Sequence, residues 1–370
     1  MRELLTLFPI LFLVYVLQCI VAVPSATTVF LLDSSLRGRL LRNSWLLGSA
    51  RYRWFLLNPF STVSSAILVD PLPFSFISDS FGAIRAVEFV HTSSQGSVQF
   101  EFDAAPPQEC SASLKQIVVG DNNVALLQSE QTAERLAALI TNLQSQPSAK
   151  RPAFIQRELR KMFSLETIRQ RMELFSRATL ILGSACFSLL LFLFILAPAA
   201  IYRLGLARIW PSLLAILVLF AFFILWAFRR AQRRLFPEKK KFGMQHLLTI
   251  AVSPFAAIRA VDALAANLLE EFHPLALACV LLSEEKFRMF AERELRRTRF
   301  VTHDVVLERA ILDFLSSQKI DSQSLLQPPA STDPRTRTYC PACLTQYVLE
   351  EGTCQDCGDV PLEKLSPSKS

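Results

Sequence analysis

The sequence of 370 residues is poor in charged side chains. Asp, Glu, Lys and Arg make up 19% of it, below the ~25% usual for soluble globular domains. Hydrophobic residues make up 51%, and the mean hydropathy is +0.33. These values exclude a mainly disordered or fibrous chain and argue against one soluble domain. The composition therefore indicates membrane-spanning segments in a chain long enough for two or three domains.

Residues that commonly carry catalysis are also scarce. The chain has 10 Gly and four scattered His, and it contains neither a phosphate-cradling glycine loop nor a G-x-S-x-G motif. His303-Asp304 matches the dipeptide of metal phosphohydrolases, but no second His and further Asp follow the spacing that this chemistry needs. We therefore predict no catalytic residue and no organic cofactor. A membrane-bound, hydrolase-like enzyme that uses His273 or His303 remains the alternative.

Three stretches are apolar and long enough to cross a bilayer, which requires about 20 residues. They are residues 4–23, 178–202 and 209–228, and none of them contains a charged residue. Only residues 203–208 join the last two, so these should form a tight helical hairpin. Uncharged spans argue against an ion-coupled transporter, whereas a small channel of oligomerised hairpins remains possible.

The first stretch has two interpretations. Its apolar run exceeds the 7–15 residues of a signal-peptide core, and Arg2 is its only basic lead, which favours an uncleaved anchor. A cleaved signal peptide is the alternative, and it would export the region that follows.

Basic residues predict the orientation of the spans. Twenty Lys and Arg residues lie in three groups beside the spans, at 37–53, 150–177 and 229–241, whereas Arg2, Arg203 and Arg208 lie at the other ends. The positive-inside tendency then places both large soluble regions and the C-terminus in the cytoplasm and the N-terminus outside. We expect a multi-pass protein of the cell membrane with the lipid bilayer as its first partner. The basic run at 229–241 serves as a topology anchor, or alternatively binds anionic lipids.

Residues 27–145 show the pattern of a β-rich module that ends in a helix. Alternation is clearest at 98–102, and from Ser129 the apolar residues recur at helical spacing. The candidate strands are 28–32, 39–47, 51–57, 63–69, 83–91, 97–102 and 114–119. Seven strands and a closing helix resemble the pleckstrin-homology-like domains of some bacterial membrane proteins, which implies a membrane-proximal binding or assembly module. Any small antiparallel sheet with a packed helix fits the same pattern.

Three further segments complete the soluble part. Residues 150–177 have the pattern of a basic amphipathic helix, which lies on the inner leaflet or, alternatively, is packed on the preceding sheet or continuous with the second span. Residues 242–318 form a predicted helical domain, with helices after Pro254, at 275–297 and after Thr302. Residues 319–337 are polar and contain prolines, which is typical of a linker.

The strongest motif lies at 338–364. Cys340, Cys343, Cys354 and Cys357 form CxxC-x10-CxxC, in which each pair can place two thiolates on one metal ion. Four thiolates select zinc, or less often iron, and a reducing cytoplasm argues against two disulfides instead. The motif resembles a zinc ribbon, with Leu344 standing where many such knuckles have glycine. Since all four positions are cysteines, a Zn²⁺ here would be structural.

The ribbon should contact protein rather than nucleic acid. Between Arg335 and Lys364 it carries three basic and five acidic residues, the wrong sign for binding phosphates. The remaining thiols, Cys19, Cys110, Cys186 and Cys279, form no set. The sequence thus predicts a multidomain α+β integral membrane protein that acts as a scaffold or interaction protein, either as a single chain or as a homo-oligomer.

Overall fold

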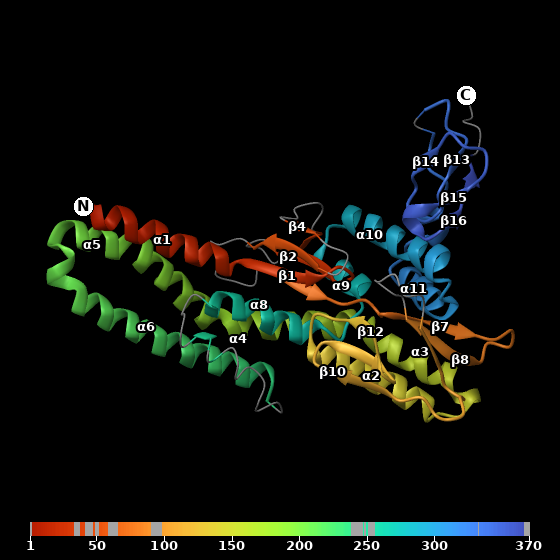
Figure 1. Cartoon of the computed structure of the whole chain (residues 1–370), viewed down its shortest axis with the longest axis horizontal. Helices are drawn as coiled ribbons and strands as arrows, with labels where there is room; N and C mark the ends of the chain where they lie inside the picture. The colour runs from red at the N-terminus through yellow and green to blue at the C-terminus, as the bar shows by residue number, and fades with distance from the viewer. Residues whose placement is uncertain are drawn as a thin grey trace. The chain divides into compact units, whose positions relative to one another are not determined.

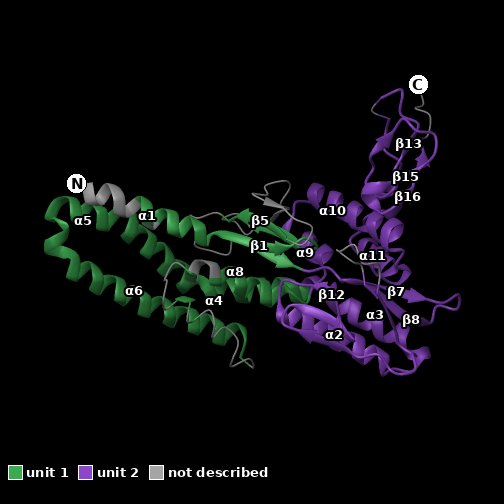
Figure 2. Ribbon diagram, in the orientation of Figure 1, with its two compact units in different colours: residues 1–69, 166–271 green, residues 70–165, 272–370 purple. Residues whose placement is uncertain are grey.

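The computed structural model combines helices with small antiparallel sheets (Figure 1). It describes residues 2–32, 38–40, 47–48, 52–57, 66–89, 98–237, 247, 249–250, 256–331 and 333–365. The chain divides into two compact units, residues 1–69 with 166–271 (unit 1) and residues 70–165 with 272–370 (unit 2) (Figure 2). Each unit is built from two stretches of chain, so the backbone passes between the units three times.

Unit 1 contains the predicted hairpin. Helix α4 (Leu165–Leu191) continues through the π-helical turn η2 (Phe192–Leu196) and α5 (Ala197–Leu204), and α6 (Leu206–Leu235) returns beside it. Gly205 makes the turn with φ 78°, a conformation that glycine adopts without strain. The π-helical turn precedes Pro198, whose ring removes one helical hydrogen bond and crowds the carbonyl four residues back.

The helical segments ending at Leu204 and at Leu235 are both long and apolar enough to cross a membrane. A third candidate arises only if α8 (Ala256–Leu269) and α9 (Pro274–Leu281) are counted as one broken span. The helical prediction for 178–202 and 209–228 is therefore confirmed.

The prediction of one helix over 4–23 is wrong at its C-terminal end. Helix α1 (Arg2–Gln18) has 17 residues, and the chain then enters strand β1 (Ile20–Pro24), which pairs antiparallel with β5 (Tyr52–Leu56). The β-branched residues Ile20, Val21 and Val23 favour the strand, where their side chains pack well on a pleated surface. The rings of Phe12 and Tyr15 on α1 lie 5.7 and 6.3 Å from that of Phe194 in η2.

Two three-stranded sheets complete unit 1. Their strand orders are β1-β5-β4, with β4 at Leu47–Gly48, and β3-β2-β6, with β3 at Gly38–Leu40, β2 at Thr28–Leu32 and β6 at Ala66–Val69. Helix α8 packs on β6 through its buried apolar residues, and Asp262 accepts a hydrogen bond of 3.2 Å from the backbone N–H of Ala66.

Several sequence features lie outside the described residues. These are the turn residues at 33–35, 58–59 and 94–96, the basic run 239–241, His91, His246 and the predicted helix start at Ser253-Pro254.

Unit 2 begins with two antiparallel meanders. The first is β7 (Phe74–Ser78), β8 (Ile84–Phe89) and β9 (Val98–Glu101); the second is β10 (Cys110–Ser113), β11 (Gln116–Val119) and β12 (Asn122–Leu126). Helix α2 (Glu130–Gln144) follows, and Ser129 caps it as predicted by accepting a 3.2 Å hydrogen bond from the N–H of Gln131. The segment predicted as one β-rich module, 27–145, thus contributes strands to both units.

Three strands of these meanders, β7, β10 and β12, were not predicted. Strand β7 follows Pro71 and Pro73, and β12 begins directly after Gly120 and Asp121. Gly120 and Asp121 make a two-residue hairpin turn there, and Gly120 has φ 58°.

The basic segment 150–177 divides in the structure. Helix α3 (Arg151–Met162) belongs to unit 2, where Ile155 and Leu159 join the core, and α4 begins at Leu165 and continues into the second span. The apolar face predicted for an interfacial helix is thus used for protein packing over its first half. The second half is continuous with the span, so neither of the two alternatives alone describes the whole segment.

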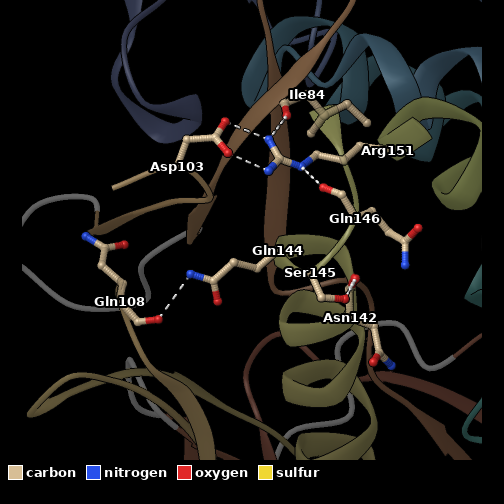
Figure 3. Close-up of polar contacts among 8 residues, drawn as sticks. All are labelled: Ile84, Asp103, Gln108, Asn142, Gln144, Ser145, Gln146 and Arg151. Carbon is tan, nitrogen blue, oxygen red and sulfur yellow. Dashed lines mark hydrogen bonds and ion pairs between the residues drawn. The ribbon is translucent and has the colours of Figure 1, made fainter. Parts of the chain in front are cut away.

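Arg151 connects four parts of unit 2 (Figure 3). Its guanidinium donates to both carboxylate oxygens of Asp103 at 2.6 and 2.8 Å, and to the carbonyl oxygens of Ile84 at 3.3 Å and Gln146 at 3.1 Å. It also lies 5.1 Å from the ring centre of Phe102. Arg151 is 2% exposed, so these contacts replace its hydration.

The rest of unit 2 is helical up to residue 325. After α9 come α10 (Glu284–Arg297), a π-helical turn η3 (Thr298–Thr302), α11 (Val305–Ser317) and α12 (Ser322–Leu325). The single helix predicted at 275–297 is wrong, because the chain is extended at Leu282 and Ser283 before α10 begins. Ser283 followed by Glu284 and Glu285 is a helix-start signal that overrides the apolar continuity.

Candidate metal centre

Short strands position the four cysteines near the C-terminus. Strand β13 (Thr338–Tyr339) pairs with β14 (Gln346–Tyr347) and β17 (Glu363–Lys364), and β15 (Thr353–Cys354) pairs with β16 (Val360–Pro361). The first cysteine pair starts directly after β13, and the second starts at the end of β15. Each pair therefore lies in a turn held between hydrogen-bonded strands.

A backbone hydrogen bond to the carbonyl of the leading cysteine closes each turn. In the first, the N–H of Leu344 donates to the carbonyl of Cys340, four residues back, at 2.8 Å; in the second, the N–H of Asp359 donates to the carbonyl of Cys354, five residues back, at 3.0 Å. The residue after the last cysteine is left-handed in both, with φ 64° at Leu344 and 74° at Gly358. A non-glycine residue in this left-handed conformation costs about 1–2 kcal/mol of conformational energy. Leu344 therefore carries a cost that a glycine at this position of the knuckle would avoid.

The four sulfur atoms converge on one point. All four lie within 4.8 Å of one another, and the Sγ atoms of Cys343 and Cys354 are 3.8 Å apart. A tetrahedral ion with metal–sulfur bonds of about 2.3 Å requires sulfur–sulfur edges of about 3.8 Å. Cys340 and Cys354 are fully buried, Cys357 is partly exposed and Cys343 is exposed. The geometry and the donor set fit a four-thiolate metal site.

Hydrogen bonds favour the metal-binding thiolate form of Cys354. Burial raises the pKa of Cys354, but the Tyr347 hydroxyl, which donates to its Sγ at 3.2 Å, and the neighbouring thiols lower that pKa to about 7. Burial raises the pKa of Cys340. Thus Cys354 is partly thiolate at neutral pH, and a bound cation would stabilise the thiolate form of all four cysteines.

The ribbon (residues 338–364) is anchored to α10 by Arg296. This side chain donates to the carbonyl of Pro341 in the first knuckle at 3.0 Å, to the carbonyl of Gln327 at 2.7 Å and to the carboxylate of Glu292 at 3.0 Å. Arg296 is 1% exposed, and Phe300 packs against the cysteine core from η3. Sequence reasoning missed this anchor, because nothing local distinguishes Arg296 from the other basic residues of α10.

The segment predicted as a linker, 319–337, takes part in the same anchoring. It contains α12 and supplies the carbonyl of Gln327, and the carbonyl of Ala330 accepts a 2.6 Å hydrogen bond from the side chain of Gln346.

The two histidines of the helical region, His273 and His303, differ in burial. His273 is buried as the N-cap of α9: its Nδ1 accepts from the N–H of Leu275 at 3.1 Å, and its ring stacks on Phe163. His273 therefore has a structural role at the start of this helix. Burial and Arg297 lower the pKa of His273 to about 3, so it is neutral at pH 7.

His303 and Asp304 have separate surroundings. His303 is exposed, whereas Asp304 is fully buried and accepts from the backbone N–H of Leu307 and of Phe76, both at 2.8 Å. Asp304 therefore caps α11 and ties it to β7. The dipeptide that resembles a phosphohydrolase motif is a helix start.

In the part of the chain that the structure describes, no other group of three or more His, Cys, Asp and Glu ligands converges. The thiols of Cys19, Cys110, Cys186 and Cys279 lie outside the cluster. Comparison of the chain with protein-family models, with curated proteins and with solved structures found no match. The cysteine cluster and the apolar helices are therefore the features from which a function can be inferred.

Proposed function

We propose that the protein is a membrane-anchored scaffold that presents a zinc-stabilised ribbon for contact with another protein. The observation that carries this proposal is the four-thiolate cluster, which leaves no coordination position for water or substrate. The firm docking of the ribbon through Arg296 supports it, because a docked module presents a constant surface.

Zinc is the ion that this donor set favours. Four thiolates in tetrahedral arrangement suit Zn²⁺ or iron, and zinc centres of this type contribute folding energy directly. The sulfur edge of 3.8 Å supports this assignment.

The proposed setting is the cell membrane, with α4–α5 and α6 in the lipid bilayer. The basic residues beside these helices support a cytoplasmic C-terminus and an N-terminus outside, and a reducing cytoplasm would keep the cysteines available for metal. The excess of acidic residues in the ribbon supports a protein partner and no nucleic acid, and a homo-oligomer is compatible with it. The resemblance of 27–145 to pleckstrin-homology-like domains stays a prediction.

Metal analysis of the full-length protein tests the proposal. We expect about one zinc per chain by elemental mass spectrometry, and loss of zinc together with faster proteolysis of residues 338–364 in Cys340→Ser and Cys354→Ser. Cys279→Ser is the matched control, since Cys279 lies outside the cluster, and it should retain both properties. Protein that holds no zinc, or cluster variants that keep the metal and the protease resistance of the ribbon, would contradict the proposal.

A further inference from the structure

Unit 2 contains a cavity of about 570 Å³ that the metal centre does not use. Helices α3 and α11 and the β7–β8 turn form its walls. Its volume lies within the ~300–1,000 Å³ typical of small-molecule sites. None of its described lining residues is a cysteine or a histidine, so its chemistry differs from that of the ribbon.

One part of the lining is apolar and rigid. It consists of side chains that are each less than 10% exposed: Ile84, Leu159, Phe163 and Phe314. The rings of Phe163 and Phe314 lie 5.1 Å apart, so an aromatic pair already forms part of this wall. Such a surface takes up a ligand's apolar body.

The cavity is also lined by two arginines and two aspartates. The exposed guanidiniums of Arg160 on α3 and Arg309 on α11 both line the cavity, and within the described residues neither forms an ion pair or a side-chain hydrogen bond. Two carboxylates, Asp79 and Asp313, also line it.

The two carboxylates are not equivalent. Asp79 accepts hydrogen bonds of 2.9 Å from the N–H groups of Phe81 and Ala83. It also forms an ion pair of 2.9 Å with Arg85, which does not line the cavity. Its charge is therefore already compensated, and Asp313 alone opposes the two arginines. The cavity thus has an apolar interior and a net positive rim.

We propose that this cavity binds a small organic anion, with its carboxylate or phosphate at Arg160 and Arg309 and its apolar part against the two phenylalanine rings. Free guanidiniums suit such anions because their planar forks present paired donors. The site is independent of the zinc ribbon and of the proposed scaffold role.

Binding of 4-phenylbutyrate to the full-length protein in phosphatidylcholine nanodiscs tests the proposal. Its neutral and cationic isosteres, 4-phenylbutanol and 4-phenylbutylamine, are the comparison ligands, and empty nanodiscs correct for partition into lipid. Titration calorimetry should show the anion binding most tightly and the amine most weakly.

Charge variants locate the site. Arg160→Gln and Arg309→Gln should each weaken anion binding about fivefold, since one exposed charge contact is worth about 1 kcal/mol, and should leave the alcohol unaffected. Asp313→Asn should strengthen it. Arg157→Gln is the matched control, because Arg157 lies on α3 outside the lining and pairs with Glu158.

Three results would overturn the proposal. The first is equal binding of the anion, the alcohol and the amine, and the second is anion binding that survives Arg160→Gln combined with Arg309→Gln. A folded protein that binds none of the three ligands would overturn it as well, and the melting temperature of each variant shows that the fold is retained.

Discussion

Replacing Arg296 by methionine should release the ribbon from α10 while leaving its metal in place. The apolar stem is kept, but three acceptors lose their donor: the carbonyls of Pro341 and Gln327 and the carboxylate of Glu292. Glu292 is about one third exposed and can be hydrated again, whereas the carbonyl of Pro341 is part of a buried contact. The main cost therefore falls on the two carbonyls.

The magnitude follows from these contacts. The loss of the donor to the buried carbonyl of Pro341 costs about 1–3 kcal/mol. Because 1.4 kcal/mol is tenfold in an equilibrium constant, local opening of the ribbon contact should become at least about fivefold more frequent. Lysine at 296 should restore only part of this, since an ammonium lacks the planar fork.

Amide hydrogen exchange of the full-length protein measures this opening, followed by mass spectrometry of peptides covering 327–347. Exchange should accelerate in Arg296→Met while the zinc content stays unchanged, because the four thiolates do not depend on Arg296. The control is Arg288→Met on the same helix, whose ion pair with Glu284 is 3.3 Å long and exposed on both sides. Exchange in Arg296→Met no faster than in Arg288→Met would refute the reasoning.

Two further predictions concern unit 2. Arg151→Met should lower the free energy of unfolding by about 1–3 kcal/mol, because the buried guanidinium's hydrogen bonds to Asp103 and to the carbonyl of Ile84 are lost, whereas the exposed Asp103 can be hydrated again. Chemical denaturation checks this, and an effect below about 0.5 kcal/mol would contradict it. Burial raises the pKa of Asp304 from its usual 3.8 to about 6, because the effect of burial exceeds that of the hydrogen bonds from Leu307 and Phe76, which lower the pKa. A raised folded-state pKa contributes stability that is full below 3.8 and is lost as the pH rises through 6. The wild type should therefore gain about 1.4 kcal/mol over Asp304→Asn between pH 7.5 and pH 5, whereas a constant difference in denaturation midpoints would contradict this.

Local pattern was sufficient for the features that depend on neighbouring residues. The long apolar helices, the cysteine knuckles and the cap at Ser129 each need only a few adjacent side chains, and the structure contains all of them. The end of α1 was predicted wrongly because an apolar run has the same hydropathy whether it forms a helix or a strand. Only the β-branched residues near Val21 indicate that the chain changes from helix to strand there.

Contacts between distant residues were not predictable in this way. Asp304 caps its own helix and also reaches Phe76, 228 positions earlier, and Arg296 reaches a knuckle 45 positions later. The cavity likewise needs α3, α11 and the β7–β8 turn together. Helical periodicity shows which face of α10 or α11 is apolar, but it does not show which element covers that face.

The structure also changes which charges bear on the orientation of the spans. Arg151 was counted among the basic residues before the second span, yet it is buried and paired with Asp103, so it offers no free charge to a lipid headgroup. Arg171 is likewise paired with Glu271. On α6, by contrast, Arg233 and Arg234 form no ion pair within the described residues. Since the positive-inside bias is strongest for basic residues close to the end of a span, the proposed cytoplasmic end of α6 rests on Arg229, Arg230, Arg233 and Arg234 more than on the total of basic residues.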